Sequence, residues 1–372
     1  MKYLCLLLGV LAFAAPGCRS EEKKTTPEPG GKDAPFVDPD AKRSGDPPGL
    51  AKGKSLFTQK SYTASLREFD EYIKLHPEDA RGYYYRAVSL QALGRNDEAV
   101  AALEKAVERE PDFPEKHNNL AGMFIVGENY EAGIRVLEAA VRKFPRETSL
   151  WYNLGLVRLK REDYGAAAGA LEKAASLGGG AKLYLTVGVA YLKMGRPKEA
   201  LKRFLKVLEG GSANAPAEEG AAKSLLALNR PKEALSHAKK AVELSPGNPS
   251  RTYLLGSVFL ALRRFNEAAE AFGRASVRAN KNPRVFLRWA EALKSSGVHE
   301  KALEQISKAE ALAGDADQMM RGEILLFKGE ILVSLKRCKK AVKVLSKAKE
   351  LLTHNGDLLK RVDEARKSCS RR

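Results

Sequence analysis

Small and apolar residues recur along this chain with a period of 34 residues. Pro77, Pro111 and Pro145 stand 34 residues apart, and Leu103 and Leu137 occupy the twenty-fourth place of two successive units that end near these prolines. The eighth and twentieth places of the same units hold small residues: Ala87, Ala121, Ala99 and Gly133. Within a unit the apolar positions have helical spacing. The pattern therefore predicts two helices per unit, helix A at about places 2–14 and helix B at 15–28. Small residues would let the two helices cross closely, because overpacking costs ~1–3 kcal/mol.

This 34-residue pattern resembles the tetratricopeptide repeat (TPR) family, whose unit is a helix–turn–helix. The resemblance implies an all-α, right-handed α-solenoid with a concave groove lined by the A helices. Nine units can be traced: 46–79, 80–113, 114–147, 148–180, 181–214, 215–248, 249–282, 283–316 and 322–355. Proline at place 32 should end helix B, because it lacks a donor and clashes with the preceding turn. In the fourth unit Gly178-Gly179-Gly180 replaces this proline, and five extra residues, Asp317 to Arg321, precede the ninth unit.

Four segments follow from this pattern. We expect a signal peptide at 1–17, a lipidated cysteine with a disordered, Pro-rich tether at 18–48, the TPR array at 49–355, and a capping helix with a basic tail at 356–372. The capping helix is expected because repeat arrays need a terminal element with a polar outer face.

The first residues have the pattern of an export signal. Lys2 precedes an apolar run from Tyr3 to Ala15, which is too short for a transmembrane helix and suits a signal peptide. Two cleavage sites compete. Ala12-Phe13-Ala14 would release a soluble product, whereas Ala15-Pro16-Gly17-Cys18 resembles a bacterial lipobox with Cys18 as the acylated residue. We favour the lipoprotein, although Ala15 and Pro16 depart from the usual pattern. The protein would then lie on the periplasmic side of a bacterial cell envelope, anchored by acyl chains.

Cys338 and Cys369 lie almost symmetrically about the turn His354-Asn355-Gly356. Two antiparallel helices leaving that turn would bring the cysteines together, which an oxidising periplasm would convert into a disulfide. The alternative is a pair of free thiols.

No catalytic or metal-binding pattern is present. The five histidines fall in different repeats, the cysteines lack metal-ligand spacing, and no glycine-rich phosphate loop follows a predicted strand. We therefore expect no enzyme, no metal and no cofactor.

The groove implied by the resemblance would carry the binding function. Asn119 and Asn153 occupy place 6 of successive units, where their amides could form a ladder that pairs with a peptide backbone. Tyr84 and Tyr152 would flank them with aromatic surface, and Lys160 with Lys193 would add positive charge at place 13. The competing explanation is a set of solvated polar residues. The family's clamp for a C-terminal carboxylate is not supported, because it needs lysine at place 5 and asparagine at place 9.

Positive charge concentrates at the C-terminus. The chain has a formal net charge of +18, and residues 336–372 hold thirteen Lys/Arg against four acids. Six of these basic residues define a candidate basic face: Lys336, Arg337, Lys339, Lys340, Lys343 and Lys347. It could attract an anionic surface, or it could be a solvated face that keeps the array soluble.

The sequence thus favours a non-catalytic, membrane-anchored TPR scaffold that binds a peptide or helix of an envelope protein. The alternative is an envelope-binding module that docks an anionic polymer or membrane through its basic face. We expect no nucleic-acid partner for an exported protein. The sequence leaves open the identity of the partner, which membrane carries the anchor and the oligomeric state.

Overall fold

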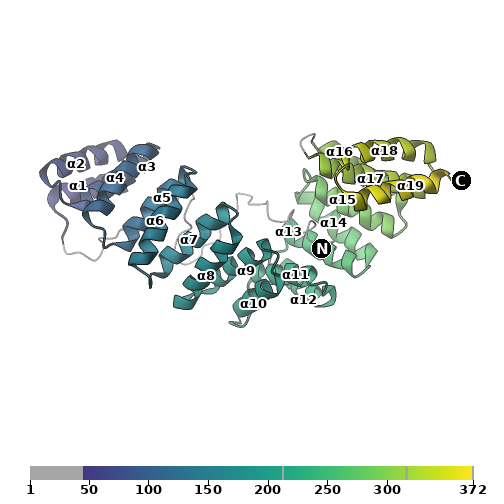
Figure 1. The fold of residues 1–372 in the computed structure, drawn as a ribbon, viewed down its shortest axis with the longest axis horizontal. Helices are drawn as coiled ribbons and strands as arrows, with labels where there is room; N and C mark the ends of the chain where they lie inside the picture. The colour runs from purple at the N-terminus through teal and green to yellow at the C-terminus, as the bar shows by residue number, and fades with distance from the viewer. Residues whose placement is uncertain (1–44, 212, 315–316, 371–372) are drawn as a thin grey trace. The chain divides into compact units, whose positions relative to one another are not determined.

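A computed structural model describes residues 45–211, 213–314 and 317–370 (Figure 1). These residues form nineteen α-helices and no strand. They divide into two units, which we call the N-terminal unit (the described residues up to 194) and the C-terminal unit (those from 195 onward). The expected signal peptide, Cys18 and all but the end of the tether lie outside the described residues. None of the described helices is both long and apolar enough to cross a membrane.

The N-terminal unit holds four helix pairs and one further helix A. Its helices are α1 (Pro48–Thr58), α2 (Tyr62–Leu75), α3 (Ala80–Ala92), α4 (Asn96–Arg109), α5 (Pro114–Val126), α6 (Tyr130–Lys143), α7 (Thr148–Lys160), α8 (Tyr164–Gly178) and α9 (Ala181–Lys193).

The C-terminal unit begins with the helix B that follows α9. Its helices are α10 (Pro197–Leu208), α11 (Ala215–Ala227), α12 (Pro231–Glu243), α13 (Pro249–Ala261), α14 (Phe265–Arg278), α15 (Pro283–Ser295), α16 (His299–Leu312), α17 (Gln318–Ser334), α18 (Cys338–Leu351) and α19 (Gly356–Ser370). The nineteen predicted helices are therefore all present. The all-α prediction is confirmed.

The turn from helix A to helix B has the same conformation in every pair. The residue at place 15 adopts a positive φ in all nine: Lys60, Gly94, Glu128, Glu162, Gly195, Asn229, Arg263, Gly297 and Lys336. In the second pair the next amide, Arg95 N, bonds back to the carbonyl of Leu90 at 2.9 Å, which satisfies a free carbonyl at the end of α3. This turn explains a difference from the prediction: helix B begins near place 17, two residues later than expected.

Helix ends follow the predicted signals. Helices α2, α4, α6 and α12 each end before the proline at place 32, as expected from its missing donor. The next helix A then starts from a capping side chain in most units: Asp79 accepts from Arg81 N, and Asn248 accepts from Ser250 N. Pro249 occupies the first helical position of α13, where its missing N–H has no cost.

The core lies where helix A crosses helix B. A Cβ added to Gly155, at place 8 of the fourth unit, would lie 2.4 Å from Cγ of Leu171 at place 24. Gly329 meets Leu345 in the same way in the ninth unit, again at 2.4 Å. The close crossing predicted from the small residues is therefore confirmed. The side chain that fills the space is the large residue at place 24.

The irregular units keep the same plan. The five extra residues before the ninth unit do not form a loop: Asp317 caps α17, and the remainder add a turn to it. Helix α17 is consequently 17 residues long, whereas α15 has 13. Helix α8 ends at Gly178, which has a φ of 126°.

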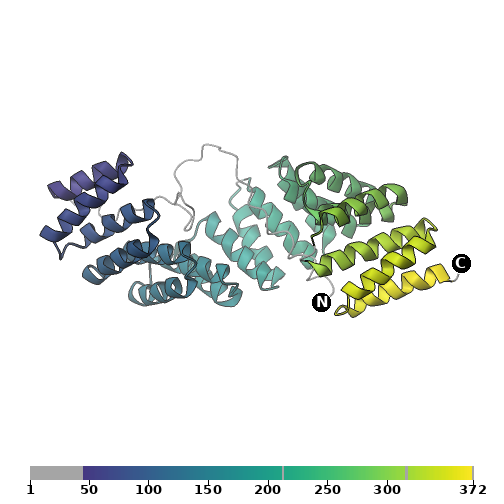
Figure 2. The same cartoon turned by 90° about the horizontal axis from the view of Figure 1, so that it is seen from above.

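The final helix packs on the last pair. Helix α19 contacts both α17 and α18, and the three lie side by side at the yellow end of the ribbon (Figure 2). Val362 of α19 is fully buried against the same core as Leu352. Cys338 and Cys369 form a disulfide with a Cα–Cα distance of 5.3 Å. The link ties the start of α18 to the end of α19.

Candidate functional site

Polar side chains connect the A helices of the N-terminal unit. Asn119 of α5 donates from Nδ2 to the hydroxyl of Tyr84 on α3 at 2.7 Å. Asn153 of α7 donates to Oδ1 of Asn118 on α5 at 2.8 Å, and Asn118 Nδ2 donates to Oγ of Ser149 at 2.9 Å. We call Asn118, Asn119, Ser149 and Asn153 the amide row.

The predicted ladder has a different register in the structure. Asn119 and Asn153 do not bond to each other; the bond across α5 and α7 runs from Asn153 to Asn118, at place 5. Asn118 and Ser149 were therefore missed as members of the row. Their polar side chains at places 5 and 2 were the available signal, but sequence spacing alone does not say which residues on two neighbouring helices meet.

The two tyrosines have different surroundings. Tyr84 is fully buried, so the expectation that its ring offers aromatic surface to a ligand is wrong. The hydroxyl of the buried Tyr84 accepts a hydrogen bond that holds the Asn119 amide in one orientation. Tyr152 is half-buried and keeps part of its ring accessible.

The two lysines predicted at place 13 also differ. Lys160 is exposed at the end of α7. Lys193 Nζ lies 5.8 Å from the centre of the Tyr164 ring on α8, within the range of a cation–π contact. Neither lysine contacts the amide row through a bond in the described residues.

Open space adjoins the amide row at Gly122. This glycine lies four residues after Asn118 on α5, so both residues share one face of the helix. A Cβ added to Gly122 would meet no atom within 4 Å, in contrast to Gly155 at the helix crossing. Within the described residues, Oδ1 of Asn119 and Oδ1 of Asn153 have no hydrogen-bond donor. Each can accept one from a ligand.

The A helices of the C-terminal unit hold charged residues instead. Glu330, at place 9 of the ninth unit, forms ion pairs with Lys294 of α15 and with Arg361 of α19 at 2.7 Å. Both cations also lie over the ring of Phe327, at 5.7 and 4.8 Å from its centre. Nearby, Arg288 pairs with Glu291 at 2.5 Å. These partly exposed charges neutralise one another.

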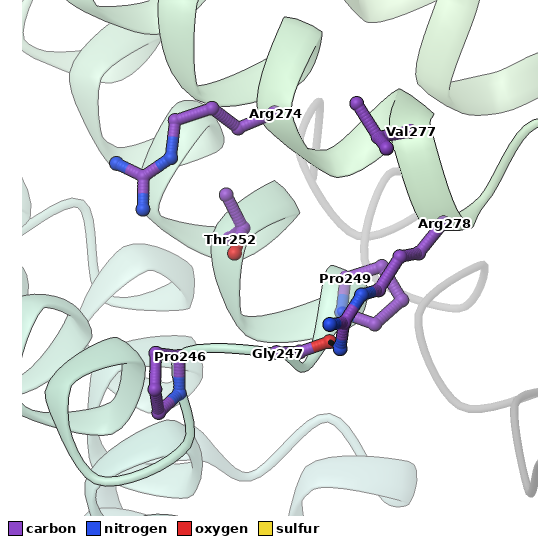
Figure 3. Close-up of a pocket in the computed structure, with 7 residues that line it drawn as sticks. All are labelled: Pro246, Gly247, Pro249, Thr252, Arg274, Val277 and Arg278. Carbon is purple, nitrogen blue, oxygen red and sulfur yellow. Dashed lines mark hydrogen bonds between the residues drawn. The ribbon is translucent and has the colours of Figure 1, made fainter.

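A cavity of about 240 Å³ lies where the turn before α13 meets the end of α14 (Figure 3). Arg278 closes one side by donating to the carbonyl of Gly247 at 2.7 Å. Arg109, at the same place of the second unit, reaches the carbonyl of Pro77 at 3.3 Å. Because the contact recurs between successive units, we interpret the cavity as part of the repeat packing.

The histidines do not assemble a site. In the described part of the chain no three His, Cys, Asp or Glu side chains are grouped to hold a metal ion. His117 donates from Nδ1 to the carbonyl of Phe113, and burial lowers the pKa of its ring. His237 pairs with Glu218 on the neighbouring helix.

The six residues of the basic face lie on α18 and the turn before it. All six are exposed. Arg337 forms an ion pair with Glu300 of α16 at 2.6 Å. The five lysines have no ion pair with any other described residue, and we call Lys336, Lys339, Lys340, Lys343 and Lys347 the lysine face.

Parts of the chain are similar in sequence to known proteins. The chain is 27% identical to an Hsp70-Hsp90 organizing protein of Triticum aestivum over 99 residues, which cover 27% of this chain and 17% of that protein. It is 36% identical to a Protein STIP1 homolog of Dictyostelium discoideum over 62 residues, or 17% and 11% of the two chains. The chain thus spans less than a fifth of these relatives.

Two solved structures share the fold. A tetratricopeptide repeat protein from Parabacteroides merdae superposes with a TM-score of 0.53 at 15% identity, covering 69% of this chain and 98% of that one. The C-terminal part of a TPR repeat-containing protein from Cytophaga hutchinsonii gives 0.51 at 14% identity, covering 66% and 98%.

Family models match the chain from the first helix pair to the start of the eighth. Models described as tetratricopeptide repeat match residues 50–114, 86–127, 124–182, 186–249 and 225–290. Together these matches cover more than half of the chain. The chain therefore belongs to the tetratricopeptide repeat family, whose repeats form a scaffold that is typically non-catalytic.

Proposed function

We propose that this protein is a scaffold that binds a peptide segment or helix of a protein partner on the A helices of its N-terminal unit. The amide row beside the open space at Gly122 carries the proposal. The family assignment supports it, because TPR domains serve as protein-binding modules.

The amide row matches the chemistry of a peptide backbone. Each backbone residue other than proline offers one N–H donor and one C=O acceptor. Asn119 and Asn153 can accept from such N–H groups through Oδ1, while their orientation is already set by bonds to Tyr84 and Asn118. Side chains held in place before binding lose less conformational entropy on association.

Gly122 gives a ligand access to this row. An alanine or larger residue at place 9 would project into the open space, whereas glycine leaves it unfilled. The half-buried ring of Tyr152 borders Asn153 in sequence and can supply apolar contact. In the ninth repeat the same place holds Glu330, which already has two partners.

We further propose that the scaffold works in a bacterial cell envelope, anchored through acylated Cys18. The apolar run from Tyr3 to Ala15 and the cysteine that follows it support an exported lipoprotein. The Cys338–Cys369 disulfide supports an oxidising compartment. Mass analysis of the N-terminal peptide from membranes of the source organism tests the anchor: a diacylglyceryl-modified Cys18 is expected, and an unmodified terminus after Ala14 would contradict it.

Selection from a random peptide library tests the binding proposal. Wild-type protein should enrich a shared peptide motif, and Gly122→Leu should lose it by filling the open space. Gly169→Leu on α8 is the matched control, because its Cβ also meets nothing within 4 Å but lies on a helix B. Failure to enrich any motif, or equal retention by the two leucine variants, would overturn the proposal.

An Asn119→Ala/Asn153→Ala variant then tests the row itself. Because Asn119→Ala also removes one hydrogen bond from the buried Tyr84 hydroxyl, Tyr84→Phe accompanies it as a control. Selected peptides should bind the double variant at least tenfold more weakly. If Tyr84→Phe alone causes the whole loss, the effect is on packing and the amides do not contact the peptide.

A further inference from the structure

Most B helices of this protein begin with an acid in their first turn. Acids occur there in α4, α6, α10, α12, α14 and α16. In four units an arginine at place 16 pairs with a glutamate at place 19, as Arg230 does with Glu233 at 2.6 Å. The acids complement the positive end of the helix dipole.

Helix α18 departs from this arrangement. It keeps the arginine of place 16 as Arg337, but place 19 holds Lys340 and no acid lies in the first turn. Lys339 occupies the same turn and Lys336 precedes it. Among the nine B helices of the described chain, α18 is the one that begins with lysines and no acid. Cations at a helix N-terminus destabilise the helix, so this arrangement does not serve folding.

The remaining lysines continue the charge along the helix. Lys340, Lys343 and Lys347 follow at intervals of three and four, which places them on one face of α18. All are exposed and have no ion pair with another described residue. The single acid of α18, Glu350, lies in its last turn. The face is therefore a row of unneutralised ammonium groups on one side of a 14-residue helix.

The geometry points to a function for this row: we propose that the lysine face docks the C-terminal unit on an anionic phospholipid surface. Ammonium groups near such a surface are attracted by its negative potential, and their contributions add. The proposal is independent of the peptide site, which lies on A helices of the other unit.

The composition of the surface favours lipid over other anionic partners. Neither α18 nor α19 contains an aromatic residue on which the bases of a single-stranded nucleic acid could stack. No large apolar side chain of either helix is exposed. The surface therefore lacks the large apolar residues that dominate the energy of protein interfaces when a partner buries them. Arg337, which could grip a phosphate bidentately, is already paired with Glu300.

Vesicle co-sedimentation of the full-length chain tests the proposal. The vesicles contain either phosphatidylcholine alone or phosphatidylcholine with 30% phosphatidylglycerol, each at low and high salt. The N-terminal apolar run is common to all variants and contributes equally. Wild-type protein should bind the anionic vesicles about a hundredfold more tightly at low salt, given several lysines at the surface. High salt should remove most of this preference.

Matched charge reversals localise the effect. Lys339→Glu/Lys343→Glu changes places 18 and 22 of the ninth unit, and Lys198→Glu/Lys202→Glu changes the same places of the fifth unit. All four lysines are exposed. The first variant should lose at least about thirtyfold in affinity for anionic vesicles, because removing two cations alone has that effect and the two added carboxylates are repelled by the surface. The second should stay within about threefold of wild type.

A single variant separates docking from a structural role. Lys340→Glu restores the acid found at place 19 of other units, so it should raise the thermal midpoint by about 2 °C. It should nevertheless weaken binding to anionic vesicles. A lysine that served only the fold would give the opposite change in stability.

Three results would overturn the proposal: no preference of wild type for anionic vesicles, equal losses in the two double variants, or Lys340→Glu binding as wild type does. A single-stranded DNA oligonucleotide provides the remaining comparison. Tight, lysine-dependent binding to DNA without binding to the vesicles would assign the face to nucleic acid instead.

Discussion

Place 9 of helix A holds contrasting residues in the third and ninth repeats, which belong to different units of this protein. In the third unit it is Gly122, with open space where a side chain would lie. In the ninth unit it is Glu330, which pairs with Lys294 and Arg361. The surrounding chemistry differs accordingly: neutral amides connect α3, α5 and α7, whereas ion pairs connect α15, α17 and α19.

This difference separates two levels of the repeat. Places 8 and 24 form the helix crossing in both units, as Gly155 with Leu171 and Gly329 with Leu345 show. Places 5, 6 and 9 hold different residues in the two regions: Asn118, Asn119 and Gly122 in the third repeat, and Leu326, Phe327 and Glu330 in the ninth. In the third and fourth repeats the asparagines at place 6 leave hydrogen-bonding capacity unused, whereas in the ninth repeat Glu330 at place 9 pairs with Lys294 and Arg361.

The largest expected effect concerns the disulfide. Replacing Cys338 and Cys369 by serine removes a link across 31 residues, which should destabilise the C-terminal unit by about 3–4 kcal/mol in the chain-entropy model. Hydrogen exchange with peptide resolution should show lost protection in α17 to α19 and none in α3 to α7. Equal loss in both regions would mean that the two units unfold together.

The ion-pair centre should matter next. Glu330→Ala leaves Lys294 and Arg361 without their carboxylate. Because the Glu330 side chain is only 14% exposed, we expect a loss of about 2–3 kcal/mol, below the range for a fully buried pair since both cations are partly exposed. Urea denaturation followed by exchange in α15 and α19 measures it. A loss under about 0.5 kcal/mol would show that the pairs are solvent-screened.

Gly155 and Gly122 lie on different A helices of the N-terminal unit, and replacing each by alanine should change the stability in opposite directions. Gly155→Ala places a Cβ 2.4 Å from Leu171 and should destabilise the protein by about 1–2 kcal/mol. Gly122→Ala adds a Cβ in open space and should stabilise helix α5 by about 0.5–1 kcal/mol. Urea midpoints of the two variants decide the matter, and a shared sign would show that place 9 is constrained by packing after all.

The smallest expected effect is on the stability of the protein at low pH. Burial alone would raise the pKa of Asp79, but hydrogen bonds from Arg81 and Tyr72 lower it to about 2. Its contribution is therefore present above its ordinary pKa and is lost as the pH falls from about 4 to about 2. After allowance for its partial exposure this amounts to about 1 kcal/mol. Asp79→Asn should flatten the fall in stability of the N-terminal unit over that range.

Glu323 in the C-terminal unit should show the reverse dependence. Burial raises the pKa of its carboxyl, so the folded state favours the protonated form and loses stability as the pH rises through that pKa. Glu323→Gln should consequently stabilise α17 at pH 7 and leave it unchanged at pH 3. Hydrogen exchange at the two pH values measures this, and a variant that is less stable at pH 7 would contradict it.

The sequence predicted the helix pairs well because their signals are local and repeated. Prolines at place 32 and small residues at place 8 each act within one unit, so a single chain is enough to find them. The turn at place 15 was not predicted. Residues such as Glu128 and Lys336 rarely adopt a positive φ, so their identity gave no signal for the turn in which the structure places them.

The candidate site was predicted only in part. Asn119 and Asn153 were expected at the right places, and both do belong to the amide row. Their bonding partners depend on how neighbouring helices are rotated about their axes, which the repeat period does not determine. The burial of Tyr84 depends on packing between α3 and its neighbours, so its sequence position alone suggested an exposed ring.

The central claim is that the space beside Gly122 admits a peptide onto the amide row. Titration of one selected peptide into wild type, Gly122→Leu and Gly169→Leu, at 50 mM and 500 mM salt, tests it most directly. We predict a Kd at least tenfold weaker for Gly122→Leu at both salt concentrations, with Gly169→Leu equal to wild type. Equal affinity of the two leucine variants, or loss of wild-type binding at the higher salt, would contradict the claim.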